Sequence, residues 1–244
     1  MSFSNGPKGI IGDGLVYTID AANPQSYNSG SGVTYDFFNQ TLSGSLDGNG
    51  TTYSTDGIGS FEFDGTDDYI EFPSLDVLSG KTQLTISTWY KPVADESGIV
   101  ALWGDTAGSF QGSCCLLYYQ GSNQLLLEVG SDGSNDYIYK SSLSSWMPKG
   151  SWHDLTFVFD STQSTNATKI KMYVNGELQT WTGNNFGFSG WSSSASNWRL
   201  ATDKTSYAAY DFEGNIAKQL IYNRPLTAAE VLQNYNSQKT RFGL

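Results

Sequence analysis

Short apolar runs, each bounded by glycine, asparagine, aspartate or serine, recur along the whole chain and constrain its fold most strongly. In Asp154–Phe159, taking every second residue places Leu155, Phe157 and Phe159 on one face, which is the period of a strand with one buried side. Runs of this kind predict strands at Leu15–Ile19, Ser60–Asp64, Tyr69–Phe72, Leu84–Tyr90, Ile99–Trp103, Cys115–Tyr119, Gln124–Val129, Tyr137–Lys140, Asp154–Phe159, Ile170–Val174, Trp198–Ala201 and Ile216–Tyr222. Because helical segments do not alternate with them, they predict an all-β sandwich of two antiparallel sheets.

Two local signals fix a turn and a helix. Asn175-Gly176 follows one of these runs, and this dipeptide tolerates the two positive φ angles of a type I′ turn, so it predicts a hairpin. Near the end of the chain, Thr227 and Glu230 have the spacing of a capping box. They predict a short C-terminal helix over residues 227–236.

The domain organisation follows from what the sequence lacks. No proline-rich linker or block of charge divides the 244 residues, so we expect one domain over residues 1–244, with residues 1–14 as an N-terminal arm. The stretches Tyr27–Thr34 and Thr182–Ser196 are rich in glycine, serine, threonine and asparagine, and we expect both to be long surface loops.

Charge and composition exclude several classes of partner. The chain has 13 Lys+Arg and 24 Asp+Glu, a net charge of −11, so it lacks the cations that bind nucleic acid. No run approaches the ~20 apolar residues of a membrane span, and the first residues show no secretory signal. The only cysteines, Cys114 and Cys115, are adjacent and form no disulfide framework. We expect a protein made in a cytoplasm, without membrane insertion.

The sequence contains no complete catalytic motif. His153, the only histidine, alternates with strand residues and is interpreted as structural. Glu62 and Asp64 share a strand face, like the first two acids of the Glu-x-Asp-x-x-Glu motif of laminarinase-type glycoside hydrolases. In that motif the first and third acids are the nucleophile and the acid/base, with carboxyl groups ~5–5.5 Å apart. The next acid, Asp67, follows Gly65-Thr66, which are turn residues expected to end the strand. We therefore expect no catalytic residues, and hydrolysis through Glu62 and Asp64 is the alternative.

Acidic turns at Asp47–Asn49, Asp64–Asp68 and Asp132–Asp136 offer oxygen atoms of the type that calcium accepts. None has EF-hand spacing, and Asp-Gly turns are common without metal. No metal ligands are assigned from the sequence.

Several motifs in order resemble those of a known family. Ser60–Ile70 resembles the F-x-G-x-x-D-Y-I hairpin of laminin-G-like domains of the concanavalin A-like superfamily. Further motifs follow at family spacing, namely Leu84–Trp89, Trp152–Phe157, Met172–Leu178, Phe212–Ala217, Ile221–Thr227 and Glu230. The resemblance implies a concanavalin A-like jelly-roll sandwich that binds glycans or proteins and is not an enzyme.

The opening segment Gly14–Tyr27 resembles the start of laminin-G-like proteins encoded by tailed bacteriophages. This resemblance implies a virion protein, such as a capsid decoration, fibre or tail-associated protein, made in the host cytoplasm. Its partners would be other virion proteins or a cell-surface glycan, and a homo-oligomer is compatible with this use. The alternatives are a carbohydrate-binding module or glycoside hydrolase acting on polysaccharide, and an assembly protein whose oligomeric contact is its whole function.

Two departures from the family bear on calcium. The loop Asp36–Leu46 keeps Asp36, Gly44 and Leu46, but other residues stand at the family's glycine and asparagine positions between them. Lys218 stands where the family has an acidic residue. The resemblance therefore allows calcium without predicting it, and no cofactor is assigned.

A sugar platform is predicted in the loop that follows the Asn-Gly hairpin. Trp181 and Trp191 offer rings for the CH faces of a sugar, and Asn184 and Asn185 offer amides for its hydroxyls. The alternative is that these tryptophans cover the edge of the sandwich or lie in a subunit contact.

Overall fold

Seventeen strands in two antiparallel sheets dominate the described part of the chain. The computed structural model describes residues 9–46, 50–73, 80–93, 99–103, 115–120, 124–131, 134–142, 145, 147–185, 198–202 and 211–244. The strands are β1 Leu15–Asp20, β2 Val33–Tyr35, β3 Ser43–Ser45, β4 Thr52–Ser54, β5 Ser60–Asp64, β6 Ile70–Phe72, β7 Gln83–Pro92, β8 Ile99–Trp103, β9 Cys115–Gln120, β10 Gln124–Ser131, β11 Ser134–Ser141, β12 His153–Asp160, β13 Ile170–Val174, β14 Glu177–Gln179, β15 Gly183–Asn185, β16 Trp198–Leu200 and β17 Glu213–Tyr222. The helical segments are α2 Asn166–Lys169, α3 Ala228–Gln238 and the 3-10 turns η1 Asp56–Ile58 and η2 Lys239–Phe242.

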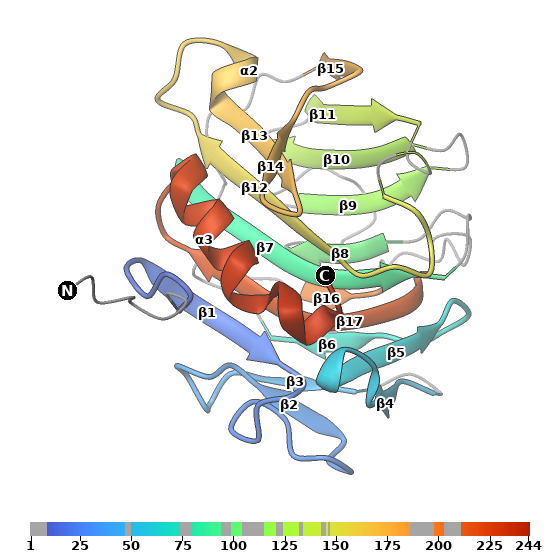
Figure 1. Ribbon diagram of the computed structural model, residues 1–244. Helices are drawn as coiled ribbons and strands as arrows, with labels where there is room; N and C mark the ends of the chain where they lie inside the picture. Colours follow the sequence, from blue (N-terminus) through green and yellow to red (C-terminus); the bar gives the residue numbers. More distant parts are fainter. Residues whose placement is uncertain are drawn as a thin grey trace, which may run out of the picture.

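The strands form an eight-stranded sheet A and a nine-stranded sheet B (Figure 1). Sheet A has the order β14-β13-β12-β7-β17-β5-β4, and β1 also pairs with β17. Sheet B has the order β15-β11-β10-β9-β8-β16-β6-β3-β2. Strands distant in sequence are therefore neighbours, and the predicted antiparallel sandwich is confirmed.

The main core lies between the two sheets and is rich in aromatic rings. Trp198 of sheet B stacks on Phe72, with ring centroids 4.1 Å apart. The ring of Tyr17 meets Trp198 edge-on at 5.2 Å, and all three side chains are fully buried. Gly44 lies directly against the Phe72 ring, where a Cβ atom would clash. The glycine therefore lets β3 close over the ring.

The C-terminal helix covers the outer face of sheet A. Figure 1 shows α3 lying across this sheet. Val231 of α3 belongs to a buried cluster that also contains Val158 of β12 and Tyr222 of β17, while Phe242 of η2 stacks on Trp89 of β7 at 4.0 Å. The central strands β7, β12 and β17 of sheet A are therefore covered on both faces over most of their length.

The predicted helix and hairpin are both confirmed. The Thr227 side chain accepts a hydrogen bond from the backbone N–H of Glu230, and the Glu230 side chain accepts one from the N–H of Thr227. The helix ends at Gln238, two residues beyond the predicted end. In the hairpin, Asn175 and Gly176 have φ angles of 53° and 79°, as a type I′ turn requires.

The two predicted long loops are each partly wrong. Val33–Tyr35 forms β2 at one edge of sheet B, with Thr34 fully buried, and Gly183–Asn185 forms β15 at the other edge. Residues 186–196 lie outside the described residues. A strand at the edge of a sheet presents unpaired backbone N–H and C=O groups, and a neighbouring segment can pair with them. This pairing uses the backbone, so a segment with polar side chains can also form an edge strand.

Part of the predicted N-terminal arm is docked. Ile10 and Ile11 pack against the cluster beneath α3, and the N–H of Ile11 donates to Asn234 Oδ1 at 2.8 Å. Residues 1–8 lie outside the described residues, and the extent of the domain stays a prediction. Within the described ranges, none of the helices has the length and apolar character needed to cross a bilayer.

Candidate functional site

The outer face of sheet B carries a charged and aromatic cluster. In β16, Trp198 and Leu200 point into the main core, so the intervening Arg199 points outward. In β6, Ile70 and Phe72 are likewise in the core, and Glu71 faces outward beside Arg199, its register partner. Two adjacent strands thus place opposite charges side by side on this face.

Arg199 is held by two contacts. Its Nε atom lies 2.6 Å from Glu71 Oε2, and its guanidinium carbon lies 4.2 Å from the centre of the Tyr69 ring. The Arg199 and Glu71 side chains are 14% and 27% exposed, so both are partly shielded from solvent. Ion pairing and the cation–π contact together fix the plane of the guanidinium group. We call Tyr69, Glu71 and Arg199 the Arg199 cluster.

Polar groups continue from this cluster toward the edge of sheet B. Ser45 of β3 is the register partner of Glu71, and Tyr35 of β2 pairs with Ser43. Because Gly44 lies against the core, strand alternation places Ser43 and Ser45 on the outer face. Hydroxyls, a carboxylate, a guanidinium and phenol rings therefore share one surface. Such a surface can hydrogen-bond a polar ligand and stack against its apolar parts.

The predicted sugar platform is only partly described. Trp181 is partly buried and packs against the main core. In β15, Asn184 pairs with Ile138 and Asn185 with Tyr137. Trp191 and the side chains of Asn184 and Asn185 lie outside the described residues. A ligand-binding role for these four residues stays a prediction.

The Arg199 cluster was missed by the sequence reasoning. Its residues do carry a local signal, because Glu71 and Arg199 are charged residues set between apolar ones in predicted strands. The two residues are 128 positions apart, and no local pattern shows that β6 and β16 are neighbours.

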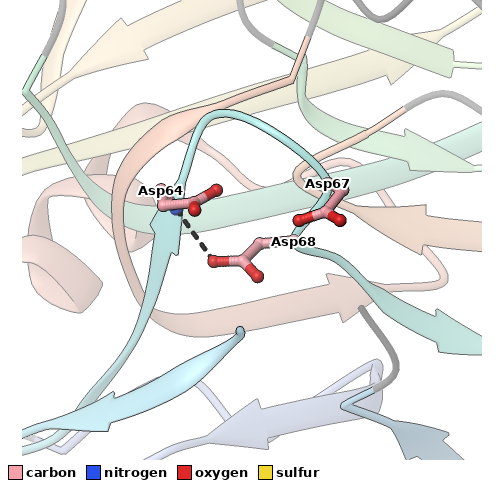
Figure 2. A group of neighbouring side chains, drawn as sticks. All are labelled: Asp64, Asp67 and Asp68. Atoms are coloured by element: carbon pink, nitrogen blue, oxygen red, sulfur yellow. Dashed lines mark hydrogen bonds between the residues drawn. The ribbon is translucent and has the colours of Figure 1, made fainter. Parts of the chain in front are cut away.

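The turn after β5 gathers three carboxylates. β5 ends at Asp64, and Gly65 has a φ of 77°, so the predicted end of the strand at Gly65-Thr66 is confirmed. One carboxylate oxygen each from Asp64, Asp67 and Asp68 lies within 4.8 Å of the others, and Figure 2 shows the three side chains at this turn. Glu62 and Asp64 are both exposed on one face of β5, but Asp67 lies beyond the turn. The three acids of the glycosidase motif are therefore not aligned along one strand.

Asp68 differs from its two neighbours in being buried, at 2% exposed. Its Oδ2 atom accepts a hydrogen bond from the N–H of Asp64 at 2.9 Å. Its Oδ1 atom is buried and finds no hydrogen-bond partner among the residues that the structure describes. Burial raises the pKa of Asp68, and the charges of Asp64, Asp67 and Asp211 raise it further.

Asp36 and Lys218, the two positions that bear on calcium in the family comparison, both bind other groups of the protein. Lys218 Nζ lies 3.2 Å from Asp20 Oδ2, so a cationic side chain occupies this place. The Asp36 carboxylate accepts hydrogen bonds from the N–H groups of Thr18 and Asn39, at 2.8 and 3.0 Å. Asp36 thus holds the backbone of its loop.

The burial and contacts of His153 agree with a structural role. It is buried in β12, and its Nε2 atom lies 2.9 Å from the carbonyl oxygen of Pro148. Burial lowers the pKa of His153, so the ring is neutral at pH 7 and packs within the fold. Cys114 and the side chain of Cys115 lie outside the described residues.

Comparison with known proteins identifies the family. A laminin-G family model, described as the concanavalin A-like lectin/glucanases superfamily, matches residues 64–232. The chain belongs to this family. The concanavalin A-like assignment agrees with the two antiparallel sheets and the single α-helix longer than one turn among the described residues. None of the curated protein sequences is significantly similar to the chain.

Solved structures share the concanavalin A-like sandwich at low sequence identity. Domain 4 of AbnA, an extracellular arabinanase from Geobacillus stearothermophilus, in complex with arabinotriose, is 19% identical with a TM-score of 0.57, covering 91% of this chain and 98% of that domain. The binding domain of botulinum neurotoxin DC, in complex with rat synaptotagmin II, is 12% identical with a TM-score of 0.67, covering 92% of this chain. Trypanosoma rangeli sialidase in complex with sialic acid is 13% identical with a TM-score of 0.62, covering 93% of this chain. The chain spans 52% of the neurotoxin domain and 33% of the sialidase, so these likenesses show the fold alone.

Proposed function

We propose that the chain is a non-enzymatic binding module that takes a glycan on the outer face of sheet B. The observation that carries the proposal is the Arg199 cluster, in which Arg199 lies over the Tyr69 ring and pairs with Glu71. A guanidinium and a carboxylate can bond neighbouring sugar hydroxyls, while a phenol ring packs against sugar CH groups. The other sheet is less suited, because α3 and η2 pack on its outer face.

Proteins with the same fold support this class of ligand. The arabinanase domain and the sialidase were solved with arabinotriose and sialic acid. The neurotoxin domain was solved with a protein, synaptotagmin II, so a protein ligand is the second candidate for the same face.

We further propose that the module is displayed on a bacteriophage particle. The support is the resemblance of Gly14–Tyr27 to the opening of laminin-G-like phage proteins. Mass spectrometry of purified particles should detect the chain in stoichiometric amounts. Particles that lack it would contradict this placement and would leave the glycan proposal standing.

The enzymatic alternative has its own test. Sialidase and arabinanase names occur among the structural neighbours, and Glu62 is the carboxylate that a glycosidase mechanism would use. We expect no release of reducing sugar from a panel of polysaccharides. Hydrolysis that disappears in Glu62→Gln would replace our proposal with the glycosidase interpretation.

The Arg199→Met variant tests the binding site. On an array of immobilised glycans that includes arabinotriose and sialosides, the native protein should bind at least one glycan. Arg199→Met should lower that affinity about tenfold or more, because it removes the charged donor that would bond the sugar hydroxyls and the contact that holds the Tyr69 ring in place.

Arg224→Met is the matched control. Arg224 forms ion pairs with Glu230 and Asp13 at 2.7 and 2.9 Å, next to the start of α3 on the sheet A side. This variant removes the same charge, so it should bind the glycan as the native protein does. Equal loss in the two variants, or unchanged binding in Arg199→Met, would contradict the assignment of the site.

A further inference from the structure

Among the strand residues that the structure describes in sheet B, Arg199 is the one cation on the outer face. These strands carry a lysine or an arginine only at Lys140 of β11 and at Arg199 of β16. Lys140 is the register partner of Leu125, which belongs to the main core, so its position lies on the inner face. Its Nζ atom donates to the carbonyl oxygen of Thr180 at 3.2 Å. On these strands, only Arg199 could attract an acidic ligand to the outer face.

Glu71 neutralises this cation. The Nε and Nη2 atoms of Arg199 lie 2.6 and 2.5 Å from the same carboxylate oxygen, Glu71 Oε2. The two residues face each other as register partners in adjacent strands, and the Tyr69 ring lies against the guanidinium group. Both charged side chains are partly shielded from solvent, so salt screens their attraction only in part. A ligand that reaches Arg199 therefore meets an ion pair without net charge.

The surroundings of this ion pair are acidic. The turn that holds the three clustered carboxylates leads directly into Tyr69. As well as burial, the charges of three other aspartates raise the pKa of Asp68, so the potential at this end of β6 is negative. Over the whole chain, 24 Asp+Glu outnumber 13 Lys+Arg. A further negative charge brought to the ion pair would be repelled.

We propose that the glycan on the outer face of sheet B is uncharged, and that Glu71 sets this specificity by neutralising Arg199. The inference rests on the proposed glycan function and names the class of its ligand. A sugar hydroxyl both donates and accepts hydrogen bonds, so it can bond Glu71 and Arg199 together without adding charge. The carboxylate of a sialic or uronic acid would have to lie beside Glu71 to reach the guanidinium group, and the two like charges would repel each other.

A glycan array that carries each oligosaccharide in a neutral form and with a terminal sialic acid tests the specificity of the native protein. We expect the neutral form to bind about tenfold or more tightly. The difference should shrink at high salt, because salt screens the repulsion. Equal or tighter binding of the sialylated forms would overturn the inference and leave the proposed glycan function standing. If neither form of any glycan binds, the proposed function fails, and this inference fails with it.

The Glu71→Gln variant tests the role of Glu71 on the same array. The amide keeps the length of the side chain and an acceptor oxygen, but it leaves the charge of Arg199 uncompensated. The affinity for sialylated forms should therefore rise about threefold or more relative to the neutral forms.

Glu177→Gln is the matched control, because it changes the net charge of the chain by the same amount. Glu177 lies in β14 of sheet A and is exposed, so this variant should keep the native ratio of affinities. If both variants change the ratio alike, the net charge of the chain sets the preference, and the role of Glu71 is overturned.

Discussion

Replacing Asp154 with asparagine is expected to remove a fall in stability that the native protein shows between about pH 4 and pH 7. Asp154 lies in β12 and is 1% exposed. Its Oδ1 atom accepts hydrogen bonds from the hydroxyls of Ser87 and Thr156, at 2.8 and 3.4 Å. Burial raises its pKa from 3.8 to about 7, although these two hydrogen bonds and the charge of Lys218 oppose the rise.

The direction of the effect follows from proton binding. Between pH 3.8 and about 7 the folded state holds the Asp154 proton and the unfolded chain has lost it, so the free energy of unfolding decreases as pH rises. This contribution is fully present below pH 3.8 and has been lost above pH 7. Its size is roughly 4 kcal/mol, from 1.36 kcal/mol for each unit of pKa.

Urea unfolding of the native protein and of Asp154→Asn across this pH range measures the effect. The neutral amide keeps an acceptor for Ser87 and Thr156, so the variant should be the more stable of the two above pH 7 and less dependent on pH. Asp160→Asn is the control, because hydrogen bonds lower the pKa of Asp160 and its contribution changes only in more acidic solution. Parallel pH profiles for the native protein and Asp154→Asn would show that the carboxyl group titrates normally.

Gly214→Ala is expected to lower the free energy of unfolding by about 3 kcal/mol or more. Gly214 lies in β17 between β5 and β7, opposite Phe63 and Pro92. Its φ is 149°, and a Cβ atom there would collide with the backbone carbonyl oxygen of Lys91. A carbonyl in a central strand cannot rotate away, so the sheet itself would have to shift.

Gly150→Ala separates this collision from backbone strain alone. Gly150 has a φ of 75°, and a Cβ atom there would meet nothing within 4 Å. The substitution should therefore lower stability by only ~1–2 kcal/mol, the usual penalty for an L-residue in the left-handed region. Chemical unfolding of both variants measures the two losses of unfolding free energy. Equal losses would mean that β7 moves at little cost to make room for the methyl group at position 214.

The strands that could be predicted from the sequence are short apolar runs bounded by turn residues, and several of them have an apolar period of two. Ser60–Asp64 and Ile170–Val174 match the structure at both ends, because alternating residues face the core. Ser43-Gly44-Ser45 and Thr52–Ser54 carry no such pattern, yet they form β3 and β4. Their strand conformation comes from pairing with β6 and β5, which lie elsewhere in the sequence.

In the candidate sites, too, local features could be predicted from the sequence, whereas features that depend on the fold could not. The turn at Gly65-Thr66 was predictable because its residues favour turns locally. The unpartnered oxygen of Asp68 was not, since it depends on how the surrounding chain buries that side chain. The Arg199 cluster was not predictable either, because it requires the order of strands in sheet B.

An NMR titration shows whether a glycan binds on the outer face of sheet B. The ¹⁵N-labelled chain would be titrated with the glycan that it binds best on the array. We predict that the largest shift changes fall on residues 33–45, 69–72 and 198–202, which surround Arg199. Changes confined to α3 and the β13–β14 hairpin, on the opposite sheet, would show that the glycan does not bind on the outer face of sheet B.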